Sequence, residues 1–195
     1  MQDRIPLELR NVGHVFGDIV AVDDFCIDIK AGEVVCLLGP SGCGKTTALR
    51  VAAGLETLQH GEVFTGGNCV AGNGVNVPPE KRGIGLVFQD FEAQLFSTNV
   101  ELETAFALEN FAEPRKEMQN RVASALNQVG LKGFEKRNPA SLSGGEKQRL
   151  AIASVLAGKP ALVVMDEPTT DLDPVGKRDI FRLAQILREE IDGII

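Results

Sequence analysis

The chain is poor in the residues that characterise several classes of protein. Its 195 residues include no tryptophan or tyrosine, only two histidines and only four cysteines. The cysteines are scattered, with no C-x-x-C pair and no neighbouring histidine cluster, so the sequence predicts neither a zinc site nor a disulfide framework. They are Cys26, Cys36, Cys43 and Cys69. Free thiols of this kind are typical of a protein in a reducing compartment.

Two further absences concern membranes and nucleic acids. No apolar run approaches the roughly 18 residues that a membrane-spanning helix needs, and no basic segment followed by an apolar stretch opens the sequence. Any membrane association is therefore expected to go through a partner. The net charge of −7 argues against a nucleic-acid-binding protein, which needs a concentrated basic face.

Four segments have the hydrophobic patterns of β-strands. Residues 7–12 and 25–30 alternate apolar and polar positions, which predicts half-buried antiparallel strands. Residues 33–39 and 161–167 begin with continuous apolar runs, which predict strands buried on both faces. With 44% apolar residues, the chain can bury the core of one domain spanning residues 1–195.

The stretches between and after these strands have apolar residues at helical spacing, which predicts helices there. Residues 45–53 are predicted to form a helix that Gly54 ends, residues 99–130 contribute to an inserted helical lobe at about 91–158, and a last helix follows Asp173. Apolar stripes support the later helices: Val122, Ala125, Leu126 and Val129 in one, and Ile180, Leu183, Ala184 and Leu187 in the other. The fold class is therefore α/β, with a mostly parallel sheet, an N-terminal antiparallel β layer and an inserted helical lobe.

A glycine-rich loop lies between the strand at 33–39 and the helix at 45–53. Its sequence, GPSGCGKT, satisfies the phosphate-loop pattern G-x-x-x-x-G-K-[ST] in the required context. In such a loop, backbone N–H groups wrap a phosphate, Lys45 brings a cation to the β and γ oxygens, and the Thr46 hydroxyl can bind Mg²⁺. The predicted ATP-binding residues are Gly39, Pro40, Ser41, Gly42, Cys43, Gly44, Lys45, Thr46 and Thr47. The alternatives are a plain glycine-rich turn and, for Cys43, either an oxidisable thiol or a passive small residue.

Two adjacent carboxylates follow the buried strand in ALVVMDE. Beside a phosphate loop, Asp166 is predicted to hold Mg²⁺ and Glu167 to polarise the attacking water as general base. This assignment requires the chain to turn immediately after Asp166, and Pro168 is consistent with such a turn. The alternative is an acidic surface turn.

A second candidate anion site lies in LSGGEKQRL. Its Ser-Gly-Gly turn stands at the head of a predicted helix, where backbone N–H groups collect. Ser143 also suits the helix N-cap position, and the two interpretations are compatible.

Together, GPSGCGKT, LSGGEKQRL, LVVMDEP and TDLDP, in that order, resemble the nucleotide-binding domain of ATP-binding cassette (ABC) proteins, whose core is a P-loop NTPase fold. The resemblance implies head-to-tail pairing with a second ABC ATPase domain, with ATP and Mg²⁺ between the phosphate loop of one subunit and the signature turn of the other. The signature residues expected to contact ATP across that dimer are Leu142, Ser143, Gly144, Gly145 and Glu146.

Three more positions match the family one at a time. Gln89 matches a catalytic glutamine that reaches the Mg²⁺ and the attacking water, with a polar strand end as the alternative. Asp173 matches an aspartate at the dimer interface, although it also suits a helix N-cap before Pro174. Phe16 stands where the family often has a tyrosine stacked on adenine, and a core phenylalanine is the alternative.

The segment FQDFEAQLFSTNVELETAFALEN is similar to the ATPases of energy-coupling-factor importers of vitamins and transition-metal ions, although Asp90 and Phe91 replace a usual Asn-Pro pair. In that family, the region corresponding to residues 89–96 receives a helix of the integral membrane subunit. Phe91, Leu95 and Phe96 are therefore predicted to bind the partner, with burial in the core as the alternative for Leu95 and Phe96.

The resemblance implies an ATP hydrolase on the cytoplasmic face of the membrane that powers an importer. The family also has a terminal strand carrying a histidine that contacts the γ-phosphate, and His14 and His60 lie too far upstream for that role. We expect the chain to be a fragment in which GII begins that strand. The alternatives are a hydrolysis-deficient regulatory subunit and a soluble ABC ATPase associated with ribosomes or DNA.

Overall fold

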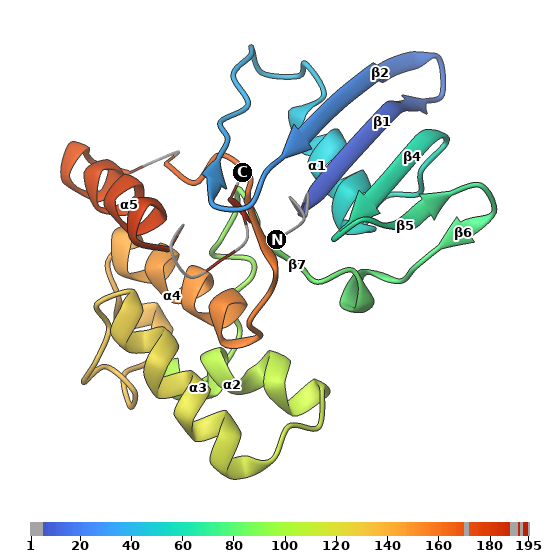
Figure 1. Cartoon of the computed structure of the whole chain (residues 1–195). Coiled ribbons are helices and arrows are strands. Elements are labelled where there is room, and N and C mark those ends of the chain that lie inside the picture. The colour runs from blue at the N-terminus through green and yellow to red at the C-terminus, as the bar shows by residue number, and fades with distance from the viewer. Residues whose placement is uncertain (1–5, 170–171, 188–190, 192, 195) are drawn as a thin grey trace. The chain divides into compact units, whose positions relative to one another are not determined.

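The computed structural model describes residues 6–169, 172–187, 191 and 193–194 (Figure 1). The chain divides into two compact units. The first comprises Met1–Leu86, Ala161–Asp166 and Leu187–Ile195, and the second comprises Val87–Pro160 and Glu167–Ile186.

An antiparallel sheet of five strands dominates the first unit, in the order β2-β1-β4-β5-β6. Leu7 pairs with Ile29 and Leu9 with Ile27, and the apolar side chains of Leu7, Leu9 and Ile29 are buried. The predicted N-terminal antiparallel layer is therefore confirmed. Its strands are β1 (Leu7–Phe16), β2 (Ile19–Ile29), β4 (His60–Thr65), β5 (Asn68–Gly72) and β6 (Val75–Asn76).

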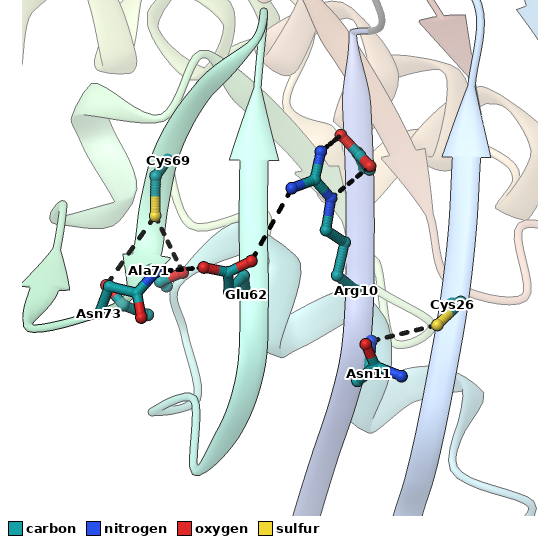
Figure 2. Close-up of polar contacts among 9 residues, drawn as sticks. Arg10, Asn11, Cys26, Glu62, Cys69, Ala71 and Asn73 are labelled. Atoms are coloured by element: carbon teal, nitrogen blue, oxygen red, sulfur yellow. Dashed lines mark hydrogen bonds and ion pairs between the residues drawn. The ribbon is translucent and has the colours of Figure 1, made fainter.

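Polar side chains connect neighbouring strands of this sheet (Figure 2). Glu62 on β4 accepts a hydrogen bond from the Asn73 side chain and lies 3.9 Å from the Arg10 guanidinium on β1. The thiol of Cys69 donates to the carbonyl of Ala71. All four cysteines are free.

A second sheet in the order β3-β9-β8-β7 contains the predicted parallel strands. Strand β9 (Gly193–Ile194) lies parallel to both β3 (Glu33–Val34) and β8 (Leu162–Met165). All residues of β8 are buried, as its continuous apolar run predicts. The fourth strand is β7 (Ile84–Val87).

The prediction for residues 33–39 is wrong in two respects. Only Glu33 and Val34 form a strand, and both are exposed, while Leu38 is 90% exposed. The physical reason is the position of β3 at the edge of its sheet, where β9 is its only neighbour among the described strands. An apolar run does not encode the order of strands in a sheet.

Helix α1 (Lys45–Ala53) has the predicted bounds. Gly44 and Gly54, at its two ends, both adopt the left-handed conformation that favours glycine. A Cβ on Gly44 would also lie 2.0 Å from the Ala21 carbonyl oxygen, so the start of α1 can approach β2 closely only without a side chain. Residues of α1, the antiparallel sheet and β8 share one hydrophobic core.

Arg82, after the short 3₁₀ helix η1 (Pro79–Lys81), fixes the end of α1. Its guanidinium is buried and donates to the carbonyls of Val51 and Ala52 at 2.9 Å each and to that of Val77 at 2.8 Å. These bonds satisfy carbonyls that the end of a helix leaves without partners. Burial lowers the pKa of the Arg82 guanidinium from its usual value.

The second unit is helical, with α2, α3 and α4 packed on one another (Figure 1). The predicted apolar stripes of α3 and α5 are buried, which confirms both helices. None of the helices in the described ranges is long and apolar enough to cross a membrane. The elements are α2 (Val100–Asn110), α3 (Arg115–Gln128), η2 (Pro139–Ser141), α4 (Gly144–Ala157) and α5 (Pro174–Leu187).

A capping box begins α4. The Ser143 hydroxyl accepts from the Glu146 N–H, and the Glu146 carboxylate accepts from the Ser143 N–H at 2.7 Å. These reciprocal bonds satisfy backbone donors at the start of the helix. The bond from the Ser143 N–H holds the pKa of the Glu146 carboxyl below its ordinary value.

Replacing Arg82 with leucine is expected to lower the free energy of unfolding by about 3 kcal/mol, because buried carbonyls lose their donors. Chemical denaturation of the purified protein measures the effect. Lys81→Leu is the matched control, since Lys81 is the exposed neighbour of Arg82. Equal stability of the Arg82 variant and the parent would contradict this role.

Glu146→Ala is expected to cost about 1 kcal/mol of stability at pH 7, because the capping box is lost. The depressed pKa of Glu146 means that its contribution is complete above the unfolded value near 4.3 and disappears as the pH falls through the folded value. Unfolding at a series of pH values from 7 to 3 should therefore show the variant converging on the parent. Glu109→Ala, at an exposed helical position, serves as control, and a difference that grows in acid would refute the assignment.

Candidate functional site

The side chain of Lys45 folds back over the phosphate loop and is held by backbone carbonyls of that loop. Lys45 Nζ donates to the carbonyls of Gly39 at 2.9 Å and Pro40 at 3.0 Å. Gly42, with φ 82°, and Gly44, with φ 88°, give the loop two left-handed residues. The loop thus presents a cation at the start of α1, where the helix dipole also favours an anion.

The loop residues differ in exposure. Pro40, Ser41, Gly42 and Cys43 are exposed, while Gly44 and Thr47 are half-buried. A Cβ on Gly39 would lie 2.6 Å from Cys43 Sγ, so a side chain at Gly39 would displace the thiol. Cys43 Sγ lies 3.7 Å from Lys45 Nζ.

Thr46 and Asp166 are 120 positions apart in the sequence and are brought together within the first unit. The Thr46 hydroxyl donates to Asp166 Oδ1 at 2.9 Å, and Asp166, directly after β8, is 6% exposed. A hydroxyl and a carboxylate are the hard oxygen ligands that Mg²⁺ prefers. Within the described residues, no three His, Cys, Asp or Glu side chains cluster as a metal site. The Thr46 hydroxyl and the Asp166 carboxylate fit a magnesium ion that keeps several waters as further ligands.

Glu167 begins a turn in the second unit. Its backbone φ is 48°, a left-handed conformation that is uncommon for a residue other than glycine. Gln89 Nε2 donates to Glu167 Oε2 at 3.0 Å. Two predicted catalytic residues that are 78 positions apart in the sequence are thus in direct contact.

The signature turn is anchored at one end and open at the other. Leu142 is buried, Ser143 and Gly144 are exposed, and Gly145 and Glu146 are half-buried. The exposed N-terminus of α4 is accessible to an anion.

Asp173 and Phe16 lie in different surroundings. Asp173 is exposed and its carboxylate accepts from the Gly176 N–H at 2.6 Å, which is the cap interaction that the sequence also suggests. Phe16 is 48% exposed with its ring edge against buried His14, at 4.5 Å between ring centroids. The alternative of a core phenylalanine is therefore wrong, because about half of the residue is exposed.

Residues 89–96 form a partly apolar surface segment in the second unit. Phe91 and Leu95 are half-buried, while Phe96 is 63% exposed and packs edge-on against Phe106. Full burial in the core, the alternative for Leu95 and Phe96, is not observed.

Sequence analysis missed two buried polar side chains near these segments. Glu103 is 3% exposed and accepts from the N–H groups of Phe96 at 2.9 Å and Ser97 at 2.6 Å. Gln148, 1% exposed, donates to the carbonyl of Pro168. Both residues lie in helices where Glu and Gln ordinarily indicate a solvent-facing position, so the pattern gave no signal.

Comparison with known proteins places these features in one family. Residues 22–170 match the family described as ABC transporter. A putative ABC transporter ATP-binding protein of Caldanaerobacter subterraneus subsp. tengcongensis is 47% identical over 87% of this chain and 30% of its own length. The Fe(3+) ions import ATP-binding protein FbpC of Streptomyces avermitilis is 43% identical over 94% of this chain and 52% of its own length.

The solved structure of CbiO1 from Clostridium perfringens, described as part of the ABC transporter complex CbiONQ, is similar over the whole chain. Its TM-score is 0.87 at 30% identity, covering 78% of that protein. The chain spans 30% to 66% of the length of the first four curated relatives. The family match and the shared fold lead to one conclusion: the chain belongs to the ABC transporter family and carries its ATPase domain.

Proposed function

We propose that the chain binds ATP with Mg²⁺ and hydrolyses it to power a membrane importer. The observation that carries this proposal is the joining of the phosphate loop to the end of β8, through the 2.9 Å hydrogen bond from Thr46 to Asp166. Lys45 would bind the β- and γ-phosphates, and Thr46, Asp166 and Gln89 would hold Mg²⁺, which offsets the charge of the phosphates. Phe16 would stack on the adenine.

Glu167 is proposed as the general base. Glu167 directly follows Asp166 in the sequence, and its carboxylate accepts a hydrogen bond from the Gln89 amide. A carboxylate held by an amide donor is oriented to accept a proton from water. The rest of the reaction is positioning and electrostatic stabilisation of a loose transition state.

The exposed signature turn supports a dimeric arrangement in which it contacts ATP bound to a second ABC ATPase domain. Ser143 and Gly144 are open at the N-terminus of α4, and Asp173 would lie at the dimer interface. Closure of the dimer would then depend on an intact triphosphate, because the signature turn contributes N–H groups to the γ-phosphate.

The importer role rests on the relatives and on residues 89–96. Relatives are named as ATP-binding proteins for spermidine/putrescine import and Fe(3+) import. The exposed Phe96 and half-buried Phe91 and Leu95 offer an apolar surface for an integral membrane subunit at the cytoplasmic face. The likeness of residues 88–110 to energy-coupling-factor ATPases favours a vitamin or a transition-metal ion as cargo.

For the domain organisation, we propose that residues 1–195 form one ABC ATPase domain with a helical lobe at about 91–158.

Glu167→Gln is expected to lower kcat for ATP hydrolysis at least about a hundredfold, because the glutamine amide cannot accept a proton. Binding of ATP, measured by equilibrium titration, should be unchanged within about twofold. The assay uses the full-length protein, with Glu80→Gln as an exposed control. Undiminished turnover in the Glu167 variant would rule out its role as base.

Ser143→Ala should weaken ATP-dependent dimerisation about tenfold or more while the monomer binds ATP normally, because the lost contact lies on the partner's nucleotide. Analytical ultracentrifugation with and without ATP measures the dimer. Ser141→Ala is the matched control, since Ser141 is a nearby exposed serine. Parallel loss of monomer binding and dimerisation would contradict a signature contact made across the dimer.

A further inference from the structure

Gln148 is a buried polar residue to which the proposed chemistry gives no role. It lies in α4, one helical turn after Gly144, and is 1% exposed. Leu150 and Ile152, further along the same helix, are fully buried and apolar. An amide at such a position requires an explanation, because burial of an amide is costly unless its groups are paired.

The amide of Gln148 is only half satisfied. Its Nε2 donates to the carbonyl of Pro168. Its Oε1 is buried and has no hydrogen-bond partner within the described part of the chain. Leaving a buried acceptor unpaired is unfavourable, so an apolar side chain of similar size would be favoured if packing alone determined this position. The donor bond to Pro168 is therefore the interaction that accounts for the glutamine.

The carbonyl that Gln148 holds belongs to the residue after Glu167. Glu167 itself has a φ of 48°, and a left-handed residue other than glycine persists only when its surroundings hold it. Within the second unit, Gln89 holds the Glu167 carboxylate, while Gln148 on α4 holds the carbonyl of Pro168, the next residue of the chain. The orientation of the Glu167 side chain depends on both contacts, because a change in its φ and ψ swings the carboxylate.

We propose that Gln148 is a positioning residue that ties α4 to the backbone after Glu167 and so keeps the carboxylate of Glu167 where it acts on water. The proposal rests on the proposed function of Glu167. Gln148 is buried, so it acts through Glu167 rather than on ATP. Since α4 begins at the signature turn, the same bond joins the turn that contacts a partner's ATP to the base of its own subunit.

Gln148→Leu removes the donor and keeps the volume of the side chain. It is expected to lower kcat about tenfold or more, while KM for ATP and monomer binding of ATP stay close to those of the parent. The unfolding midpoint should also change little, because removal of the unpaired Oε1 offsets the loss of the donor to Pro168. A purely structural role would instead lower the unfolding midpoint and leave kcat per folded molecule unchanged. Gln148→Met, which is unbranched, replaces the leucine variant if that protein does not fold. Ser154→Ala is the matched control, because Ser154 is a polar residue of α4 that bonds to Ala151 within the helix.

A double-mutant cycle with Glu167→Gln decides whether Gln148 acts through Glu167. Single-turnover rates of the parent, the two single variants and the double variant are compared in the full-length protein. If Gln148 only positions Glu167, the double variant should match Glu167→Gln within about twofold. The positioning role would be overturned if the rate losses of the two single variants multiply in the double variant, or if Gln148→Leu is as fast as the parent. The proposed function would stand in both cases. A parent that does not hydrolyse ATP would instead overturn the proposed function, and the role of Gln148 with it.

Discussion

The hydrogen bond from Thr46 to Asp166 is the contact on which the first unit depends. It joins side chains 120 positions apart in the sequence, one at the start of α1 and one at the end of β8. Asp166 is 6% exposed, and a carboxylate at that depth is tolerated only when hydrogen bonds or a cation compensate its lost hydration. The shared core of α1, β8 and the antiparallel sheet brings the end of β8 to the phosphate loop, and Arg82 fixes the opposite end of α1.

The chain passes from the first unit to the second at the peptide between Asp166 and Glu167. Asp166 contacts Thr46 of the first unit, and Glu167 contacts Gln89 of the second. In the proposed mechanism, the residue that binds metal and the residue that activates water thus belong to separate compact units, although they are consecutive in the chain. The left-handed φ of Glu167 is the local distortion that allows two neighbouring carboxylates to serve different units.

Sequence reasoning succeeded where local chemistry determines structure. Gly44 and Gly54 set the bounds of α1, the 3.6-residue stripe of Ile180, Leu183 and Leu187 set the buried face of α5, and the apolar run set the burial of β8. It failed for residues 33–39, because exposure there depends on the edge position of β3. In the candidate site, the motif residues were found because their spacing is distinctive, whereas Glu103 and Gln148 were missed. A buried Glu or Gln in a helix has the same local sequence as an exposed one, and only the tertiary fold supplies its partner.

Three of the buried polar side chains bind backbone groups, whereas buried Asp166 accepts a hydrogen bond from a side chain. Arg82, Glu103 and Gln148 each bind backbone groups at the end of a helix or in a loop. Unpaired backbone groups are costly when buried, so these side chains stabilise the backbone segments that they bind. The hydrogen bond from Thr46 to Asp166 instead joins two side chains, a hydroxyl and a carboxylate. Both side chains carry the hard oxygen ligands that Mg²⁺ prefers, so in the proposed mechanism this pair would hold a cation while Arg82, Glu103 and Gln148 hold the backbone.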